Sequence, residues 1–538
     1  MPMLSETYRA GANNQVAALA LAGISVFVTW ILWRKPSVVF TPPRAQVSLG
    51  WRYLWWAIAV AMLWTAVLGF AVLQAHVYWG DAGYFLHQLQ AGLDFQRVLY
   101  RDFEFPYGPL LYWWPAAFVQ GLAPLGVSRG VAYLESLAAM QALGLGLAFY
   151  VVRALPLRRS LQAAAFLLLS CGTLTSLLGL NYSLMRFALP LAGVVLLSRQ
   201  SRLRGAVAVA MFGEATMLAV SPELGLAFAA AATVYGASVA MQRGWRWATI
   251  GVIAIISGLF LFTIIGGDFF LTIGRMAHGE YNLLLTPAPH IVALLAAAVV
   301  LAPLALARGL RGPHAGLLAA VYVVGLGILP GAMGRCDPIH VFFNGLPLLL
   351  LSFVAVEPAS AVRRRVWLAL VVLVLALTQV ANAGLYRDRL RMIAGGEAGG
   401  IPAAAYEGVD VARLREALAG GQVSAPALAP EPVTAELAGK GQYVPGFYCG
   451  WVGVWDDAAE QRKIAEMRET KFALVVTTDP AHSNPVEEQR LQRWMKFGFA
   501  AHPLREPWVA GALLNAELQA GWRQTGVFGD YALYERRK

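Results

Sequence analysis

Ionisable residues at the ends of long apolar segments are the first candidates for chemistry in this sequence. Asp81 lies in "HVYWGDAGYFLHQL", residues 76–89, directly after a long apolar run. Arg335 and His340 lie in "GRCDPIHVFFNGLP", residues 334–347, between two further apolar runs. A charge at a membrane surface is costly and usually functional. Aspartate can serve as a general base, whereas arginine and histidine can donate hydrogen bonds to phosphate oxygens.

Several other polar residues occupy comparable positions. After Asp81, the segment "YRDFEFPYGPLLYWWPAAF" carries prolines and many aromatic residues, which favours helices lying in the interface. A corner, "SPELG", covers residues 221–225, and a long connection, residues 266–290, is expected to be a mobile substrate loop. Arg186 is a further candidate for phosphate binding. The residues expected to bind substrate are Asp102, Glu104, Tyr107, Glu223, Tyr281, Asp337 and Asn344.

Each of these residues also has a purely structural interpretation. Asp81 could cap the helix that follows it, and Glu223 could cap another. Asp102 and Glu104 could be solvated loop charges paired with Arg97 or Arg101, and Arg335 could pair with Asp337 to shape the turn. His340 could simply bond to backbone. The tyrosines and tryptophans at 107–114 could anchor the chain at the interface rather than bind sugar.

The sequence contains no pattern typical of a metal site. Its three cysteines, Cys171, Cys336 and Cys449, are too few and too scattered for a zinc site or a disulfide framework. One bridge is possible, and Cys336 with Cys449 is the favoured pair. A divalent ion, Mg or Mn, remains optional, with Asp102 or Glu104 as a conceivable ligand.

The composition indicates what must position these residues. Of 538 residues, 58% are hydrophobic and 14% are charged, which is typical of a polytopic membrane protein. Residues 1–384 hold 24 Lys and Arg against 12 Asp and Glu, whereas residues 385–538 hold 18 against 19. The basic excess therefore belongs to the apolar part, where membrane insertion explains it. Nucleic-acid binding is not needed to account for it.

Apolar runs about 20 residues long, enough to cross the hydrocarbon layer, recur throughout the first 384 residues. If the first run passes inward, alternate connections carry 17 basic residues on one side and 7 on the other, which supports twelve crossings and an external N-terminus. The first run has no basic cluster before it and is not a cleavable signal peptide. The predicted spans are 15–33, 53–75, 128–152, 160–180, 187–198, 205–220, 223–241, 245–265, 290–307, 313–333, 341–356 and 366–384.

The last part of the chain, residues 385–538, has a different character. The stretch "SAPALAPEPV", residues 424–433, is typical of a linker. Helical spacing follows in "DAAEQRKIAEMRE" and "VEEQRLQRWMKFG", and strand patterns in "FALVVTTD" and "YALYER". We therefore expect an α-helical polytopic membrane domain at 1–384, with interfacial helices in the loop 76–128, and a small external α/β domain at 385–538. Both termini are expected on the external side.

"WGDAGYF", "YRDFEFPYGPLLYW" and "GRCDPIHVFFNG", with their placement between apolar spans, give the chain a family resemblance. It resembles the C superfamily of membrane glycosyltransferases, in particular the bacterial polyprenyl-phosphate-sugar enzymes related to protein mannosyltransferases and lipid A aminoarabinose transferases. The resemblance covers roughly residues 53–385. One span precedes the usual first one, and the C-terminal domain is outside the resemblance.

The resemblance implies an enzyme of the bacterial inner membrane that moves a hexose or pentose on the periplasmic side. Its donor would be a polyprenyl-phosphate-linked sugar, and its acceptor a lipid, a glycan or a protein. A lipid phosphate leaves readily as an anion, so a single base suffices where glycosidases need two carboxylates. Asp81 is the expected base, and Arg335, His340 and Arg186 are expected to hold the phosphate.

Two other classes of protein fit the same sequence. A transporter or lipid flippase also has many spans, and Glu135 and Glu214 inside predicted spans could relay protons. Against it, no internal repeat is visible, although many transporters are built from two related halves. A non-enzymatic assembly factor that binds through its external domain is the third possibility.

Overall fold

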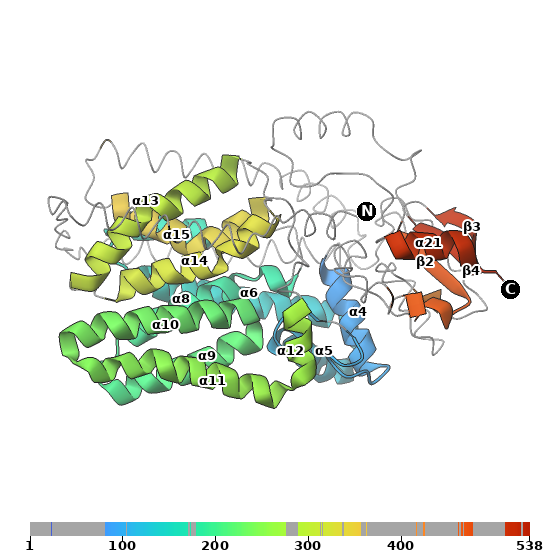
Figure 1. The fold of residues 1–538 in the computed structure, drawn as a ribbon, viewed down its shortest axis with the longest axis horizontal. Helices are drawn as coiled ribbons and strands as arrows, with labels where there is room; N and C mark the ends of the chain where they lie inside the picture. The colour runs from blue at the N-terminus through green and yellow to red at the C-terminus, as the bar shows by residue number, and fades with distance from the viewer. Residues whose placement is uncertain are drawn as a thin grey trace.

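Long α-helices make up most of the structure, which is a computed structural model (Figure 1). Apart from residues 23 and 424, the predicted spans 15–33, 53–75 and 366–384, the predicted linker at 424–433 and all three cysteines lie outside the described residues. The structure describes residues 23, 81–103, 105–170, 173, 179–275, 289–311, 314, 316–335, 338–356, 362, 416, 423–424, 461, 464–465, 467–476, 512–528 and 531–537.

A helix lies in every span predicted between residues 128 and 356. Among the described residues, five helical segments are long and apolar enough to cross a membrane: Arg129–Ala154, Leu203–Val220, Pro222–Arg243, Trp245–Ile265 and Ile339–Val356. The total of twelve crossings stays a prediction. The long helices are α6 (Arg129–Ala154), α7 (Arg159–Ser170), α8 (Leu184–Ser198), α9 (Leu203–Val220), α10 (Pro222–Arg243), α11 (Thr249–Ile265), α13 (Pro289–Arg311), α14 (Leu317–Arg335) and α15 (Pro338–Val356).

Helix α10 is central to the bundle, packing against α8, α9, α11 and α14. Its sequence is rich in alanine and glycine, which lets neighbouring backbones approach closely. At Gly327 of α14, an added Cβ would lie 2.7 Å from the Cβ of Ala227 in α10. Small residues on both helices therefore fix how closely they pack, as is typical of helices in a membrane.

Helix α11 presents a broad apolar face to its surroundings. Since apolar side chains project outward over successive turns, this face suits contact with lipid rather than water. The short η4 (Trp245–Ala248) leads into α11, with Trp245 exposed and Trp247 buried. The exposed large hydrophobic side chains on α11 are Val252, Ile255, Ile256, Leu259, Phe260 and Ile264.

The two ends of the bundle differ in chemistry. Arg199, after the end of α8, lies 4.4 Å from the ring of Tyr150 at the end of α6, and Arg243 at the end of α10 donates to the carbonyl of Gln200. These arginines belong to the connections predicted to share one side. The starts of α8 and α10 therefore lie at the other end, which agrees with the predicted alternation.

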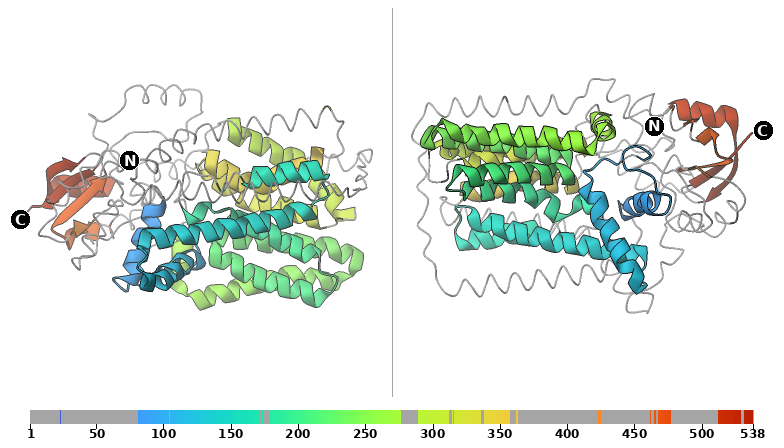
Figure 2. Two further views of the ribbon diagram at one scale, coloured as in Figure 1. Left: turned by 180° about the vertical axis from the view of Figure 1, so that it is seen from behind. Right: turned by 90° about the horizontal axis from the view of Figure 1, so that it is seen from below.

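Three shorter helices lie at that other end: α4 (Asp81–Leu93), α5 (Leu110–Leu122) and α12 (Gly267–Arg275) (Figures 1 and 2). A short η1 (Ala123–Leu125) follows α5, and η3 (Leu180–Tyr182) precedes α8. Helices α4 and α5 lie in the loop 76–128, where helices were predicted, and their place in the membrane interface stays a prediction. A stack of aromatic side chains joins them, with Phe105 between Tyr84 at 6.2 Å and Tyr112 at 6.2 Å between ring centroids.

The C-terminal part contains a four-stranded sheet in the order β1–β2–β4–β3. Strand β1 (Val423–Ser424) is parallel to β2 (Phe472–Val476), whereas β4 (Tyr531–Arg536) is antiparallel to both of its neighbours, β2 and β3 (Trp522–Phe528). Helix α21 (Ala512–Gly521) precedes β3, and its Leu518 packs with Trp522 in a small core. The structure thus confirms the strands predicted in "FALVVTTD" and "YALYER".

Candidate active site

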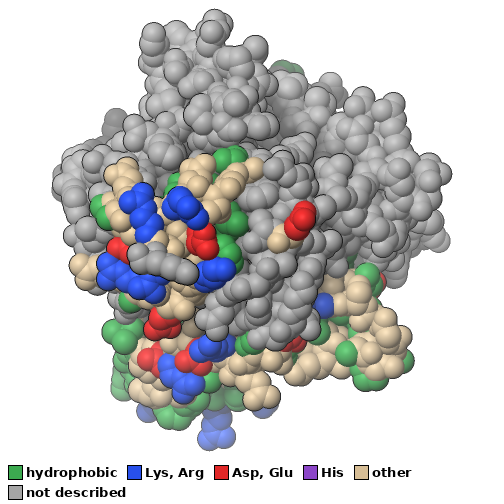
Figure 3. Space-filling view, turned by 90° about the vertical axis from the view of Figure 1, so that its right-hand side faces the viewer, with side chains coloured by type: hydrophobic (Ala, Val, Ile, Leu, Met, Phe, Trp, Pro, Cys, Tyr) green, Lys and Arg blue, Asp and Glu red, His purple; other side chains and the backbone are tan. Residues whose placement is uncertain are grey.

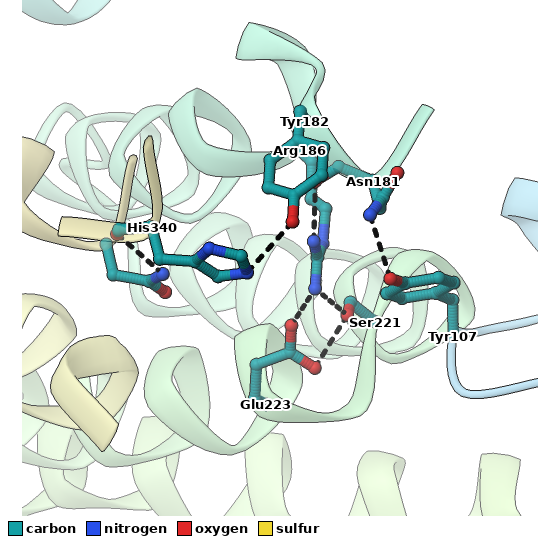
Figure 4. A network of polar contacts seen from close by, with 8 residues as sticks. Tyr107, Asn181, Tyr182, Arg186, Ser221, Glu223 and His340 are labelled. Atoms are coloured by element: carbon teal, nitrogen blue, oxygen red, sulfur yellow. Dashed lines mark hydrogen bonds and ion pairs between the residues drawn. The ribbon is translucent and has the colours of Figure 1, made fainter. Parts of the chain in front are cut away.

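The guanidinium of Arg186 is the centre of a polar network at the end of the bundle where α8, α10 and α15 begin (Figure 4). Arg186 lies in the first turn of α8 and is 8% exposed. One terminal nitrogen donates to the carbonyl of Asn181 at 2.6 Å, and the other donates to Ser221 Oγ at 2.9 Å and to the Glu223 carboxylate. A buried arginine is thus held by two separate segments, η3 and the start of α10.

Ser221 and Glu223 reach Arg186 from the start of α10. Pro222 stands at the first helical position, where its missing N–H costs nothing, so the helix begins there. The Ser221 hydroxyl donates to Glu223 at 2.6 Å, and Glu223 accepts from Arg186 as well. Glu223 sits in the first turn rather than at the cap position, so capping is not its role. It balances the charge of Arg186.

Tyr107 brings the loop between α4 and α5 to the same place. The guanidinium carbon of Arg186 lies 4.9 Å from the centroid of the Tyr107 ring, a cation–π contact. The Tyr107 hydroxyl accepts from Asn181 Nδ2 at 2.9 Å. The next residue, Gly108, donates its N–H to the carbonyl of Val220 at 3.1 Å, so the loop is pinned to the end of α9. A Cβ at Gly108 would lie 2.3 Å from the Ala219 oxygen, which explains the glycine.

His340 joins the network from the start of α15. Its Nε2 shares a hydrogen bond of 2.9 Å with the hydroxyl of Tyr182, and the two rings meet edge to face. One turn later, Asn344 donates from Nδ2 to the carbonyl of His340 at 2.9 Å. Asn344 is buried and close to Gly331 of α14. The turn between α14 and α15 is thus tied to the segment that precedes Arg186.

Three helix starts converge here, which gives the site a positive electrostatic character. The first turns of α8, α10 and α15 leave backbone N–H groups without partners inside the helix, and the helix dipole adds partial positive charge. Helix N-termini are common binding places for phosphate. With Arg186 and His340 beside them, the site suits an anion.

Two buried hydrogen-bond donors of the site have no partner within the part of the chain that the structure describes. They are Arg186 Nε and the Ser183 hydroxyl, and Ser183 is 0% exposed. Ser183 precedes α8 as its N-cap but makes no capping bond. Buried donors without partners are unfavourable and call for an explanation. Both atoms could donate to a bound anion.

Asp81 is the first residue of α4, and the structure does not describe its side chain. Four residues later, Phe85 stacks on the ring of Tyr107 with 6.0 Å between centroids. Residues four apart lie on the same face of a helix. Asp81 therefore lies one helical turn before Phe85, the residue of α4 that contacts Tyr107. Helix α4 also packs against η3.

The remaining candidate residues either lie away from the Arg186 network or have side chains that the structure does not describe. Asp102 is outside the network: it pairs with Arg101 at 2.9 Å and accepts from the N–H of Val98 at 2.8 Å. These two interactions lower the pKa of Asp102 to about 2. Arg335 ends α14, but its side chain is not described, and Glu104, Tyr281 and Asp337 lie outside the described residues.

Sequence reasoning did not find Asn181, Tyr182 or Ser221. Asn181 and Tyr182 lie in η3, directly after the predicted span 160–180, and the next span was expected to begin at 187. Helix α8 in fact begins at Leu184. The window of apolar residues misses its first turn because that turn contains the charged Arg186. The signal available was the run "NYSLMR", in which polar residues lead directly into an apolar helix.

Exposed charges at this end of the molecule lie among charges of opposite sign (Figure 3). Arg129 pairs with Asp94 at 2.5 Å, and in the C-terminal part Arg468 pairs with Glu517 at 2.6 Å. Exposed pairs of this kind contribute little to stability.

Among the described residues, no group of three or more His, Cys, Asp or Glu side chains is placed to hold a metal ion.

Comparison with solved structures identifies the architecture. ArnT from Cupriavidus metallidurans, solved bound to undecaprenyl phosphate, is similar with a TM-score of 0.50 and 13% identity, covering 91% of this chain and 98% of its own. The chain therefore shares the fold of ArnT. The apo structure of the same ArnT gives a TM-score of 0.43 and 12% identity, covering 90% of this chain and 97% of its own.

The likeness to ArnT confirms the fold that the sequence resemblance implied. It also extends further than residues 53–385, because 91% of the chain is too large a share to exclude the C-terminal part. No protein-family model matches the sequence. No curated protein matches it either.

Proposed function

We propose that this chain is a membrane glycosyltransferase that transfers a sugar from a polyprenyl-phosphate donor to an acceptor outside the cytoplasm. The observation that supports it best is the Arg186 network at the end of the bundle where three helices begin. A buried arginine beside a histidine and helix N-termini suits the phosphate of a lipid carrier. The ArnT structure with this fold was solved with undecaprenyl phosphate.

In the proposed reaction, Asp81 accepts the proton of the acceptor hydroxyl as its oxygen attacks the anomeric carbon. The new carbon–oxygen bond forms while the bond from the anomeric carbon to the phosphate oxygen breaks. The phosphate leaves with the electron pair. Because the acceptor attacks the face opposite the leaving phosphate in a single displacement, the configuration at the anomeric carbon inverts. Arg186 and His340 stabilise the negative charge that develops on the phosphate, and Arg335 is a further donor for it.

Glu223 has two functions in this scheme. Without a ligand, it balances the charge of Arg186. When the lipid phosphate arrives, it competes with Glu223 for the guanidinium, and the carboxylate becomes available to accept from sugar hydroxyls. The side chain of Glu223 is 41% exposed, whereas that of Arg186 is 10% exposed, so the carboxylate has room to move.

The aspartate-to-asparagine change tests this proposal. Asp81→Asn keeps the size of the side chain and removes the base. Transfer of labelled sugar from an undecaprenyl-phosphate donor should fall about 10²- to 10⁴-fold, the usual contribution of a general base. Binding of undecaprenyl phosphate should persist. Unchanged turnover would remove Asp81 from the mechanism.

One observation favours the alternative of a transporter or flippase. Glu214, in α9, is 2% exposed, and its Oε2 has no hydrogen-bond partner in the described part of the chain. Its carboxyl lies against Gly225 of α10 and Gly258 of α11. A carboxyl inside a membrane helix is often part of a proton pathway. Movement of a labelled lipid across vesicles that Glu214→Gln abolishes, without any sugar transfer, would support this alternative.

A further inference from the structure

Tyr100 has a backbone conformation that large side chains rarely adopt. Its φ is +70°, in the left-handed region where Cβ crowds the neighbouring carbonyl. Its N–H donates to the carbonyl of Phe103 at 3.1 Å, which closes a tight turn in the first external loop. Such strain persists only where surrounding contacts enforce it, and strained residues gather at functional sites. The contacts of Tyr100 therefore indicate why the structure keeps this strained backbone conformation.

The side chain of Tyr100 joins two parts of the molecule. Its hydroxyl donates to the carbonyl of Tyr107 at 2.7 Å, and its ring packs on Phe269 of α12 with 4.8 Å between centroids. Phe269 in turn stacks on Phe262 at the end of α11. Burial raises the pKa of Tyr100, so the hydroxyl keeps the proton that it donates. Tyr100 thus fastens the main chain at Tyr107 to a helix of the bundle.

Tyr107 carries this constraint to Arg186. The Tyr107 ring lies against the guanidinium at 4.9 Å, and its hydroxyl is held by Asn181, whose carbonyl also accepts from Arg186. A displacement of the Tyr107 main chain would therefore move both the ring and the Asn181 contact. The position of Arg186 depends on Tyr107, and Tyr107 depends on Tyr100.

We propose that Tyr100 is a positioning residue: through Tyr107, it fixes the Arg186 guanidinium for the phosphate of the lipid donor. The inference rests on the proposed function, because that function assigns the phosphate to Arg186. Tyr100 does not itself touch the lipid. A residue that only supported the fold would change stability without changing what Arg186 contributes to binding.

A double-mutant cycle separates these two roles. Tyr100→Phe removes only the hydroxyl, and Arg186→Gln removes the guanidinium. The measurement is the affinity of the full-length protein for undecaprenyl phosphate in detergent. In the native background, Tyr100→Phe should weaken binding about fivefold, the worth of one hydrogen bond. In the Arg186→Gln background, the same change should have almost no further effect, because residues that act through one another are not additive.

Tyr235→Phe is the matched control. The Tyr235 hydroxyl also donates to a backbone carbonyl, that of Leu197 at 3.1 Å, but near the far end of α8. It should lower thermal stability without changing the affinity for undecaprenyl phosphate.

Two results would overturn the inference alone: an unchanged affinity in Tyr100→Phe, or the same loss of affinity in both backgrounds. If Arg186→Gln by itself leaves the affinity intact, the phosphate assignment of the proposed function fails, and the role of Tyr100 fails with it.

Discussion

Tyr182 and His340 share a hydrogen bond of 2.9 Å although 158 positions separate them in the chain. Tyr182 ends η3 just before α8, and His340 lies in the first turn of α15. The bond therefore ties the turn before α15 to the segment that carries Arg186. This link brings two distant candidate regions of the sequence to one place.

Removal of this hydrogen bond should impair the proposed reaction. In Tyr182→Phe, the ring still meets His340, but Nε2 loses the partner that orients it. We expect kcat/KM for sugar transfer to fall about tenfold, as when an oriented donor to a leaving group loses its support. Kinetics with a labelled undecaprenyl-phosphate donor measure the change. A variant as active as the native protein would show that the His340 orientation is unimportant.

Glu223→Gln should strengthen binding of the bare lipid phosphate. The Glu223 carboxylate competes with phosphate for Arg186. The glutamine amide that replaces it is neutral and repels phosphate less. We expect the affinity for undecaprenyl phosphate to rise about three- to tenfold, more at low salt than at high salt. Titrations at two ionic strengths test this. A weaker affinity would mean that Glu223 mainly holds Arg186 in place and does not compete with the phosphate.

Gly108→Ala should disrupt the contact between the loop that joins α4 to α5 and the end of α9. The added Cβ would meet backbone atoms of Ala219 and Leu218 at 2.3–2.4 Å, and backbone cannot move aside easily. We expect a loss of about 1–3 kcal/mol of stability, the usual cost of overpacking, together with lower transfer. Thermal unfolding in detergent measures the stability.

Gly121→Ala, in α5, is the control for this prediction because a Cβ there meets nothing within 4 Å. It should be neutral or slightly stabilising, since alanine favours helix. Equal stability of the two variants would argue against the tight contact at Gly108.

Asp102 should contribute to stability in a pH-dependent way. Its hydrogen bonds from Arg101 and Val98 lower its pKa from 3.8 to about 2 in the folded protein. A lowered pKa means that the contribution is complete above the ordinary value and disappears as the pH falls through about 2. Asp102→Asn should therefore unfold at a lower temperature than the native protein at pH 7.

The difference between the two proteins should vanish as the pH approaches 2, and it should be small because Asp102 is near solvent. Unfolding temperatures at pH 2, 4 and 7 provide the test. A difference that does not change with pH would show that the charge of Asp102 has no part in the turn.

The long helices of the bundle were predictable because each lies in an extended apolar run, and the alternation of basic residues indicated which of their ends share a side. The start of α8 was not predictable from hydropathy, because Arg186 is buried by partners from other segments. A hydropathy pattern registers a charge as an interruption, whereas the fold pairs the Arg186 guanidinium with the Glu223 carboxylate and with the carbonyl of Asn181. Strand β3 was also missed, since the irregular register between Gln524 and Gly526 breaks its alternation.

The candidate site was predictable only in part. Arg186, Tyr107, Glu223, His340 and Asn344 were all proposed from their residue types and positions, and the structure brings them together. The sequence could not show which of them touch, because the contacts depend on Asn181, Tyr182 and Ser221. These neutral polar residues have no distinctive spacing. Their significance lies in the side chains that the fold places beside them.

The central claim is that the lipid phosphate binds where α8, α10 and α15 begin, and a density map of the protein with undecaprenyl phosphate tests it most directly. We predict that the phosphate lies within hydrogen-bond distance of Arg186, with His340 beside it and the lipid chain leading away between helices. A phosphate bound elsewhere, for example beside Glu214 along α9, would contradict this account.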